Sequence, residues 1–365
     1  MQRQPYSQQA VLENENLISK TADKLVQRIK VHAQDFSRTR CVDVFPLCGL
    51  FSLEVICKAA FNKEWSDLES GASSLLQAMD ESAKLLPIDA ALPFLKRFGI
   101  GEYVPGLIGR TFKEFRNWSE ATRKLLRDFQ QDEVSRDRSQ RFMATPLIMA
   151  EDGYLGRVLT EDEAVEEAMG IAFAGSGTTS TTLVYLLYNL SLPENISHQQ
   201  KLREELRAAG ETLHQLQNLP YLNAVIKETM RLNPTIISTL PRVLDVDLPL
   251  AKTGFALPAG TIVGMQNYVH HRDASIFPDP ECFRPERWLG NCDLAENSIT
   301  PFSLGPRNCI GQNLARAELY LAVSRIFRQL SLTLSKSMKE SDMEMEDRFN
   351  IAPRGRKLFL DVKIL

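Results

Sequence analysis

The sequence lacks the marks of several classes of protein. Its six cysteines include no C-x-x-C pair, and a chain of 365 residues with so few cysteines needs no disulfide framework, so a reducing compartment is expected. No window carries a dense stripe of lysine and arginine and the net charge is −3, so nucleic acid is not expected as a partner. We find neither an internal repeat nor a low-complexity linker, and we therefore predict a single domain over residues 1–365.

Long apolar segments are also missing. Residues 1–35 stay polar and contain no apolar segment of the signal-peptide type. The longest apolar stretch, 44–53, contains Pro46 and Gly49 and is well short of the ~20 residues that a spanning helix needs. No anchor is visible, and we expect the chain as given to be soluble or peripheral.

The hydrophobic pattern predicts a mainly α protein with a small β region. Hydrophobic residues make up 44% of the chain and charged residues 24%, which is ordinary for a globular protein with a sizeable core. Apolar residues at helical spacing predict helices at 18–33, 45–61, 66–86, 108–134, 220–232 and from Cys309 to about Leu330. Short β-like runs lie between 240 and 267, and 357–362 has the pattern of a strand.

The longest predicted helix begins at a capping box. Thr160 is followed three residues later by Glu163, and a largely apolar run then continues to Pro193. Such a helix would be roughly 46 Å long and would cross a whole domain. The patch 174–179, AGSGTT, is unusual inside a helix, so two helices joined by a flexible linker remain an alternative.

The strongest motif surrounds Cys309. Residues 302–311 read FSLGPRNCIG and match F-x-x-G-x-R-x-C-x-G at its five fixed positions, which are Phe302, Gly305, Arg307, Cys309 and Gly311. A chance match in a chain of this length has a probability on the order of 10⁻⁴. This pattern is the haem-binding signature of the cytochrome P450 family, which the chain resembles over nearly all of its length. For Cys309 taken alone, a buried structural cysteine is the alternative.

The chemistry of a haem-thiolate site explains the spacing. A thiolate directly before a helix receives backbone N–H groups and the positive end of the helix dipole, which lower the pKa of the thiol. Gly305 and Gly311 would let the backbone pass close to a flat macrocycle. The resemblance implies haem b as the cofactor, with Cys309 as the axial iron ligand and Arg307 on a haem propionate.

Three charged residues extend the resemblance. Glu228 and Arg231 stand three positions apart on one predicted helix, a spacing that alone is more often a solvated surface pair. The segment 283–288, FRPERW, resembles the family's P-E-R-F/W segment, whose arginine here is Arg287. The resemblance implies a buried structural triad of Glu228, Arg231 and Arg287 that fixes the loop approaching Cys309.

On the long helix, Thr178 matches an alcohol that in the family helps to deliver protons during oxygen activation. Gly175 and Gly177 would open space for the ligand. Gly177 stands where the family usually has an acid. One interpretation is that water replaces that acid, and another is that the reaction has a different proton demand. A helix kink with only a packing role is the alternative.

Other residues are assigned with less specific motifs. Arg242, after Leu240 and Pro241, resembles the family's second propionate contact, and a solvent-exposed turn arginine is the alternative. The substrate pocket is expected to include small or apolar residues, namely Phe173, Ala174, Ile237 and Ala352. His270 and His271 with Cys282 and Cys292 suggest zinc, although their spacing matches no tight finger pattern.

The resemblance implies a monooxygenase that inserts one oxygen atom from O₂ into a small lipophilic organic substrate. NADPH–cytochrome P450 reductase would supply the electrons to a monomeric enzyme at the cytoplasmic face of the endoplasmic reticulum membrane. The P-E-R-W segment and the Ser/Thr-rich long helix resemble the microsomal, fungal-type branch, often in secondary metabolism.

Two alternatives remain open. The sequence has no suitable W-x-x-x-R motif, since Trp118 is followed by Thr122 four residues later. We therefore expect a cytochrome P450 fold that lacks its N-terminal portion, and a truncated, non-functional relic with weak or no haem binding is one alternative. The other is a haem-thiolate isomerase or dehydratase, which NADPH-independent turnover would identify.

Overall fold

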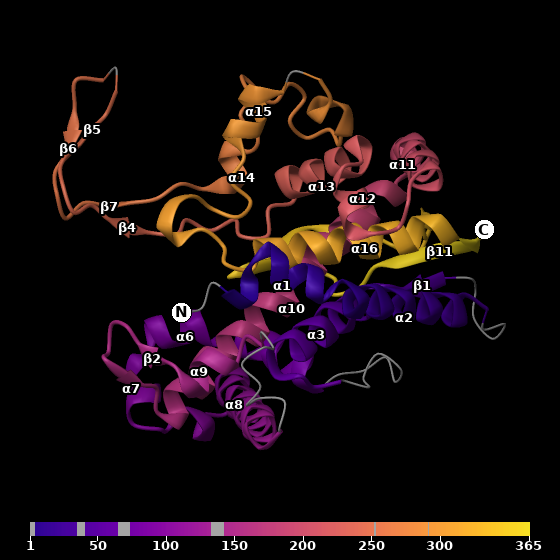
Figure 1. The fold of residues 1–365 in the computed structure, drawn as a ribbon. Coiled ribbons are helices and arrows are strands. Elements are labelled where there is room, and N and C mark those ends of the chain that lie inside the picture. Colours follow the sequence, from indigo (N-terminus) through magenta and orange to yellow (C-terminus); the bar gives the residue numbers. More distant parts are fainter. Residues whose placement is uncertain (1–3, 35–40, 65–73, 133–141, 252, 291) are drawn as a thin grey trace.

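A long central helix, α10 (Glu161–Ser191), organises the computed structural model (Figure 1). The structure describes residues 4–34, 41–64, 74–132, 142–251, 253–290 and 292–365. The predicted capping box is confirmed, because the Thr160 N–H donates to the Glu163 carboxylate at 2.8 Å and the Glu163 N–H donates to Thr160 Oγ1 at 3.4 Å. The helix runs without a break through 174–179, so the alternative of a flexible linker is wrong.

The N-terminal helices are α1 (Gln8–Glu13) and α2 (Glu15–Gln34), which pack against α16 (Gln312–Gln329), and α3 (Phe45–Phe61), which packs against α10. The helices predicted at 18–33 and 45–61 are thus confirmed. Helix α3 is buried on nearly every side, because α10 covers one face and α2 another. Burial on both sides of α10 compensates for its glycines and small polar residues, which have low helix propensity.

A second group of helices covers another side of α10 and comprises α5 (Ser74–Ser82), α6 (Leu85–Ala91), α7 (Pro93–Arg97), α8 (Leu107–Gln131) and α9 (Thr145–Met149). The helix predicted at 66–86 ends at Ser82, and α6 begins separately at Leu85. Its first part, 66–73, lies outside the described residues. The helix predicted at 108–134 is α8, and residues 133 and 134 also lie outside the described ranges.

The C-terminal half contributes α11 (Ile196–Ala208), α12 (Leu213–Gln217), α13 (Pro220–Leu232), α14 (Asn267–His270), α15 (Asp293–Ser298) and α16 (Gln312–Gln329). The predicted helix 220–232 is confirmed at both ends, since Pro220 starts α13 and Pro234 follows its C-cap Asn233. In Figure 1, α16 lies between α1 on one side and α12 and α13 on the other.

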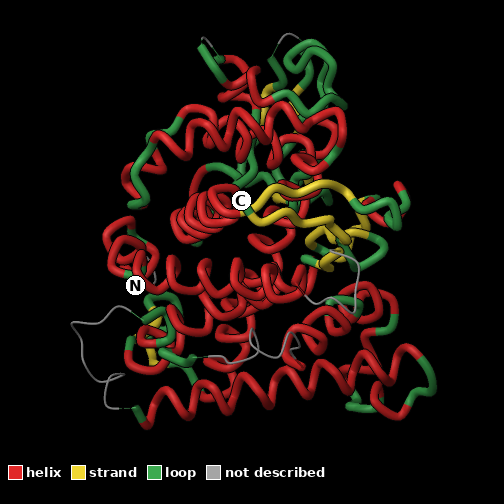
Figure 2. The backbone as a smooth tube through the Cα atoms, turned by 90° about the vertical axis from the view of Figure 1, so that its right-hand side faces the viewer, coloured by secondary structure: helices red, strands yellow, loops and turns green. Residues whose placement is uncertain are grey.

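The sheets are small. Three antiparallel strands in the order β1 (Cys41–Asp43), β11 (Phe359–Ile364) and β8 (Leu330–Leu334) join the two halves of the chain, with Val42 opposite Leu360 and Val362 opposite Leu332. Figure 2 shows the longer strands gathered on one side of the helices. The mainly α fold class with a small β region is confirmed.

The other strands form two-stranded ribbons: β2 (Glu151–Asp152) with β3 (Arg157–Val158), β4 (Arg242–Val243) with β7 (Ile262–Val263), β5 (Leu248–Pro249) with β6 (Ala256–Leu257), and β9 (Met345–Arg348) with β10 (Asn350–Pro353). The β-like runs predicted between 240 and 267 correspond to β4–β7, which project away from the helices in Figure 1. In the described part of the chain, no helix combines the length and apolarity needed to cross a bilayer.

Candidate functional site

A cavity of about 440 Å³ lies between α10 and the loop that carries Cys309, and we call it the central cavity. Its walls include Ile56, Ile171, Ala174, Gly175, Thr178, Phe302, Arg307, Cys309, Gly311, Leu314 and Glu318. Five residues that the sequence motifs single out, Thr178, Phe302, Arg307, Cys309 and Gly311, therefore line one space. They come from segments far apart in the chain, α10 and the loop before α16.

Backbone hydrogen bonds close the loop that presents Cys309. The Cys309 N–H donates to the Phe302 carbonyl at 2.8 Å, and the Asn308 N–H donates to the Gly305 carbonyl at 3.1 Å. Gly305 has φ of +69°, a left-handed conformation that favours glycine. Gly305 lies on the outer side of this loop and lines a separate surface pocket with Asn308 and Cys309, rather than the central cavity.

Opposing effects act on the Cys309 thiol. Burial raises the pKa of this thiol, and the hydrogen bond from the Gly311 backbone lowers it by a smaller amount. The sequence-based expectation of a lowered pKa is therefore wrong for the protein alone, because loss of water around the sulfur outweighs the helix N-terminus. A coordinated metal cation would reverse this balance, since a coordinating thiol is deprotonated.

Thr178 and two nearby glycines of α10, Gly175 and Gly177, have different neighbours. Thr178 Oγ1 donates to the Ala174 carbonyl at 2.7 Å, so the hydroxyl can still accept a hydrogen bond. A Cβ on Gly175 would lie 2.5 Å from the Ile56 side chain, and one on Gly177 would lie 3.1 Å from Asn350 Nδ2. Gly175 lines the central cavity and Gly177 lines a different one, and a side chain at either position would meet a neighbouring side chain. That these glycines open space for a ligand stays a prediction.

The four residues expected in the substrate pocket do not come together. Ala174 lines the central cavity, whereas Phe173 and Ala352 line a cavity of about 270 Å³ on another face of α10 and Ile237 lines a third. Successive residues of a helix point about 100° apart, so Phe173 and Ala174 face different ways. Phe173 packs against Trp118 and Phe349, with ring centroids 5.9 Å and 6.2 Å away.

Arg242 lies on the projecting strand β4, where its side chain is exposed and Nη1 donates to the Pro241 carbonyl at 2.9 Å. Its neighbour Leu240 lines the central cavity, but Arg242 is not among the lining residues. The geometry corresponds to the alternative of an exposed turn arginine.

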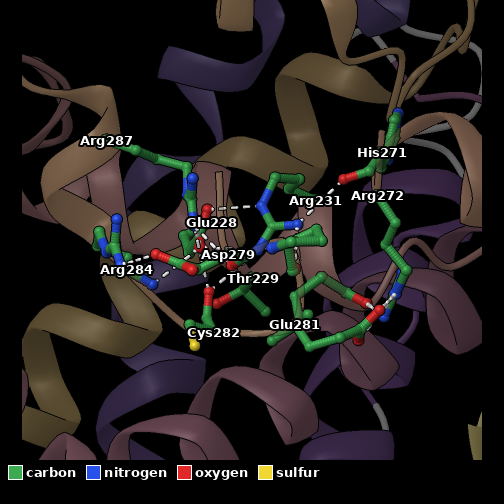
Figure 3. A network of polar contacts seen from close by, with 12 residues as sticks. Glu228, Thr229, Arg231, His271, Arg272, Asp279, Glu281, Cys282, Arg284 and Arg287 are labelled. Carbon is green, nitrogen blue, oxygen red and sulfur yellow. Dashed lines mark hydrogen bonds and ion pairs between the residues drawn. The ribbon is translucent and has the colours of Figure 1, made fainter. Parts of the chain in front are cut away.

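The predicted triad forms a buried network (Figure 3). Arg231 Nε and Nη2 each donate to one oxygen of the Glu228 carboxylate at 2.9 Å, and Arg287 Nε donates to Glu228 Oε1 at 3.0 Å. The side chains of Glu228 and Arg231 are 0% exposed and that of Arg287 is 7% exposed. A charged group this deeply buried is tolerable because every charge is paired.

Further donors complete the hydrogen bonding of the Glu228 carboxylate. Trp288 Nε1 donates to Oε2 at 2.9 Å and the Arg284 N–H donates to Oε1 at 2.8 Å. Arg231 also donates to the backbone carbonyls of His271, Pro280 and Cys282 at 3.0, 2.7 and 3.2 Å. The network thus holds α13 to the segment that leads towards the Cys309 loop.

The zinc alternative finds no preassembled cluster. Among the described residues no three His, Cys, Asp or Glu side chains form a group that could hold a metal ion. His271 instead accepts the Thr300 N–H at Nε2, at 3.0 Å.

Sequence reasoning missed Tyr6 and Glu318 at this site, and it considered His271 only as a zinc ligand. Tyr6, near the beginning of the described chain, lines the central cavity, and burial together with Glu167 and Cys309 raises the pKa of Tyr6 to about 12. Glu318 lines the same cavity and is 1% exposed. His271 is 0% exposed. A charged residue on the buried face of a predicted helix was an available signal for Glu318; Tyr6 and His271 depend on distant contacts.

Comparison with known proteins gives a consistent match. The family model described as "Cytochrome P450" matches residues 3–359. The chain is 37% identical over 193 residues, 52% of its length, to "Cytochrome P450 monooxygenase orf2" of Aspergillus niger. It is 29% identical over 347 residues, 90% of its length, to "Cytochrome P450 3A12" of the dog.

A third similar protein is "N-acetyltryptophan 6-hydroxylase ivoC" of Emericella nidulans, which is 32% identical over 321 residues, or 83% of this chain. The matched regions cover 39%, 65% and 59% of the Aspergillus, dog and Emericella proteins. The chain therefore spans only part of each relative's length.

Proposed function

The chain belongs to the cytochrome P450 family, and on that premise we propose that it is a haem-thiolate monooxygenase in which Cys309 is the axial ligand. The reaction would insert one oxygen atom of O₂ into a small lipophilic organic substrate, RH. In balanced form, RH, O₂, two protons and two electrons give ROH and water. The observation that carries the proposal is that Cys309 and Thr178 line one largely apolar cavity from two different elements.

The central cavity fits a flat, apolar cofactor with an anionic edge. Ile56, Ile171, Leu314 and Leu319 give apolar walls. At Gly311, a Cβ would have only the Cys309 sulfur within 4.0 Å, so the absence of a side chain leaves open space beside the sulfur among the described residues. The lining also contains one thiol, that of Cys309, and one guanidinium, that of Arg307, which are the groups that would hold an iron and a carboxylate. Two acids, Glu167 and Glu318, and several hydroxyl groups line the same cavity.

Haem, when bound, supplies the oxygen-activating chemistry. The hydrogen bond from the Cys309 N–H to the Phe302 carbonyl would fix the residue that carries the sulfur. Arg307 would bind an anionic group of the cofactor, and the apolar walls would keep water out of the cavity. Thr178, whose hydroxyl proton is bonded to the Ala174 carbonyl, would accept a proton donor such as water and orient it.

The remaining parts of the proposal come from the family. NADPH–cytochrome P450 reductase would donate the electrons to a monomer at the cytoplasmic face of the endoplasmic reticulum membrane. The similarity to fungal monooxygenases supports a place in secondary metabolism. One relative is named a hydroxylase, which supports hydroxylation as the reaction class.

Oxygen labelling tests this function. Purified protein, loaded with haem and supplied with reductase, NADPH and ¹⁸O₂, should convert members of a lipophilic compound library into products that carry one ¹⁸O atom. Turnover without NADPH and without label would instead favour the isomerase or dehydratase alternative. Failure to bind haem at all would favour the inactive relic.

A further inference from the structure

His271 contacts two parts of the site at once. Its backbone carbonyl accepts Arg231 Nη1 at 3.0 Å, and its ring Nε2 accepts the Thr300 N–H at 3.0 Å. The residue is fully buried, and Figure 3 shows its carbonyl directed at Arg231. One buried residue, through its backbone carbonyl and its ring, therefore joins the ion-pair network to the segment that enters the Cys309 loop.

From Thr300 the contacts continue to the sulfur-bearing residue. Thr300 Oγ1 donates to Asn267 Oδ1 at 2.9 Å, and the Ser303 N–H donates to the Thr300 carbonyl at 3.0 Å. Phe302, between these two residues, accepts the Cys309 N–H at 2.8 Å. Thr300 and Phe302 both line the central cavity, so a displacement of Thr300 would change the shape of the cavity wall.

We propose that His271 is a positioning residue, whose neutral imidazole couples the Glu228–Arg231–Arg287 network to the Cys309 loop and so sets where the Cys309 sulfur stands. The inference rests on the proposed function, because the sulfur's position matters only if it binds the cofactor. Nothing in the family signature or in the triad itself assigns this role to His271.

The protonation state that this role needs is favoured by the surroundings. To accept the Thr300 N–H, Nε2 must be unprotonated, which places the ring proton on Nδ1. Burial lowers the pKa of His271 to about 4, and the charges of His270, Arg231 and Arg272 act in the same direction. Nδ1 is buried and has no hydrogen-bond partner among the described residues. Among the described residues, the ring therefore makes one hydrogen bond, the one to the Thr300 N–H.

A matched pair of variants tests the role. His271→Phe keeps a ring of similar size but removes the acceptor, whereas His271→Gln offers a carbonyl oxygen at similar reach. His270→Phe is the control, because this neighbouring ring lies beside that of His271, with centroids 6.0 Å apart and the ring planes tilted by 48°. The first readout, amide hydrogen exchange at Thr300 in haem-free protein, needs no bound cofactor.

We expect Thr300 exchange to accelerate about tenfold in His271→Phe and to stay near the wild-type rate in the other two variants, since one buried hydrogen bond is lost. In haem-loaded protein, the ferrous CO complex of His271→Phe should shift in part from the thiolate to the neutral-thiol Soret position. His271→Gln should restore the thiolate band. Unchanged exchange in His271→Phe, or faster exchange with an unaltered Soret band, would overturn the proposal.

A measurement on the wild-type protein covers the case in which His271→Phe does not fold. ¹⁵N labelling of both histidine and threonine should show an unprotonated Nε2 with a through-bond coupling to the Thr300 nitrogen, and a protonated Nε2 would overturn the proposal. If wild-type protein binds no haem while this coupling is present, the proposed function fails and the link between His271 and Thr300 stands.

Discussion

Glu228 and Arg231 form a fully enclosed, bidentate ion pair, with both Arg231 contacts at 2.9 Å and both side chains 0% exposed. Three further donors, Arg287 Nε, Trp288 Nε1 and the Arg284 N–H, share the same carboxylate. Because the charges are out of contact with water, removing one leaves its partners uncompensated, which costs far more than losing a surface pair. This pair therefore holds α13 against the segment that precedes the Cys309 loop.

The first prediction concerns this network. Glu228→Gln should lower the free energy of unfolding by about 3–5 kcal/mol, because Arg231 and Arg287 would keep buried charges without a counterion. Glu281→Gln, which removes an exposed acid paired with Arg272, should cost less than about 1 kcal/mol. Chemical denaturation of both variants provides the comparison, and similar losses would contradict the structural role of the triad.

The second prediction concerns Gly175. Ala at this position would place a Cβ 2.5 Å from Ile56, so Gly175→Ala should destabilise the protein by about 1–3 kcal/mol. Gly170 lies on the same helix with nothing within 4 Å of its Cβ position, so Gly170→Ala should stabilise by up to about 1 kcal/mol.

The double variant Gly175→Ala/Ile56→Ala separates steric overlap from other causes. If steric overlap is responsible, Gly175→Ala should lower the free energy of unfolding clearly less in the Ile56→Ala background than in the wild-type protein. Additive losses in thermal unfolding would show that the contact between α3 and α10 is not what selects glycine.

The third prediction follows from Glu318. Burial raises the pKa of this carboxyl well above 4.5, against a smaller opposite effect of the Ser52 hydroxyl. Above pH 4.5 the unfolded chain ionises this group while the folded protein keeps it protonated, so the unfolded state binds fewer protons and stability falls as pH rises. As the pH rises, Glu318 should thus lower the free energy of unfolding by up to about 1.4 kcal/mol per pH unit, until the pKa of Glu318 in the folded protein is reached.

Glu318→Gln removes this dependence. We expect the stability of the variant relative to wild type to increase between pH 5 and pH 7, measured by denaturant unfolding in the same cofactor state. Glu340→Gln, at an exposed position, should leave the wild-type slope in place. If the free energies of unfolding of wild type and Glu318→Gln change in parallel with pH, a protonated Glu318 carboxyl in the wall of the central cavity is contradicted.

The fourth prediction concerns Thr178 and depends on the proposed function. Thr178→Ala removes the hydroxyl from the central cavity and should reduce the product formed per NADPH by about tenfold or more, with hydrogen peroxide formed instead. Thr178→Ser should retain most of the coupling. Ser176→Ala is the matched control, because Ser176 Oγ makes the same kind of bond, to the Ala172 carbonyl at 2.8 Å. Ser176 lines the cavity that contains Phe173 and Ala352, not the central cavity.

Much of the fold could be predicted because local signals agreed with tertiary packing. Proline at position 220 and at position 234 bounds α13, and the capping box at Thr160 and Glu163 starts α10. The continuity of α10 through 174–179 could not be read from propensity, because it comes from burial against α3.

The site was predictable where a motif fixed several residues together, as around Cys309. Assignment of single apolar residues to the pocket was less successful, since Phe173 and Ala174 are neighbours in sequence and face different cavities. His271 was considered only as a zinc ligand, because its contact with Thr300 is one that only the folded chain brings about.

The most direct test is the optical spectrum of the ferrous CO complex of haem-loaded protein, compared between wild type, Cys309→Ser and Cys282→Ser. Cys282 has an exposed side chain, so its replacement controls for general loss of a thiol. We predict the long-wavelength Soret band of thiolate ligation in wild type and Cys282→Ser, and its absence in Cys309→Ser. The same band in Cys309→Ser would contradict the account.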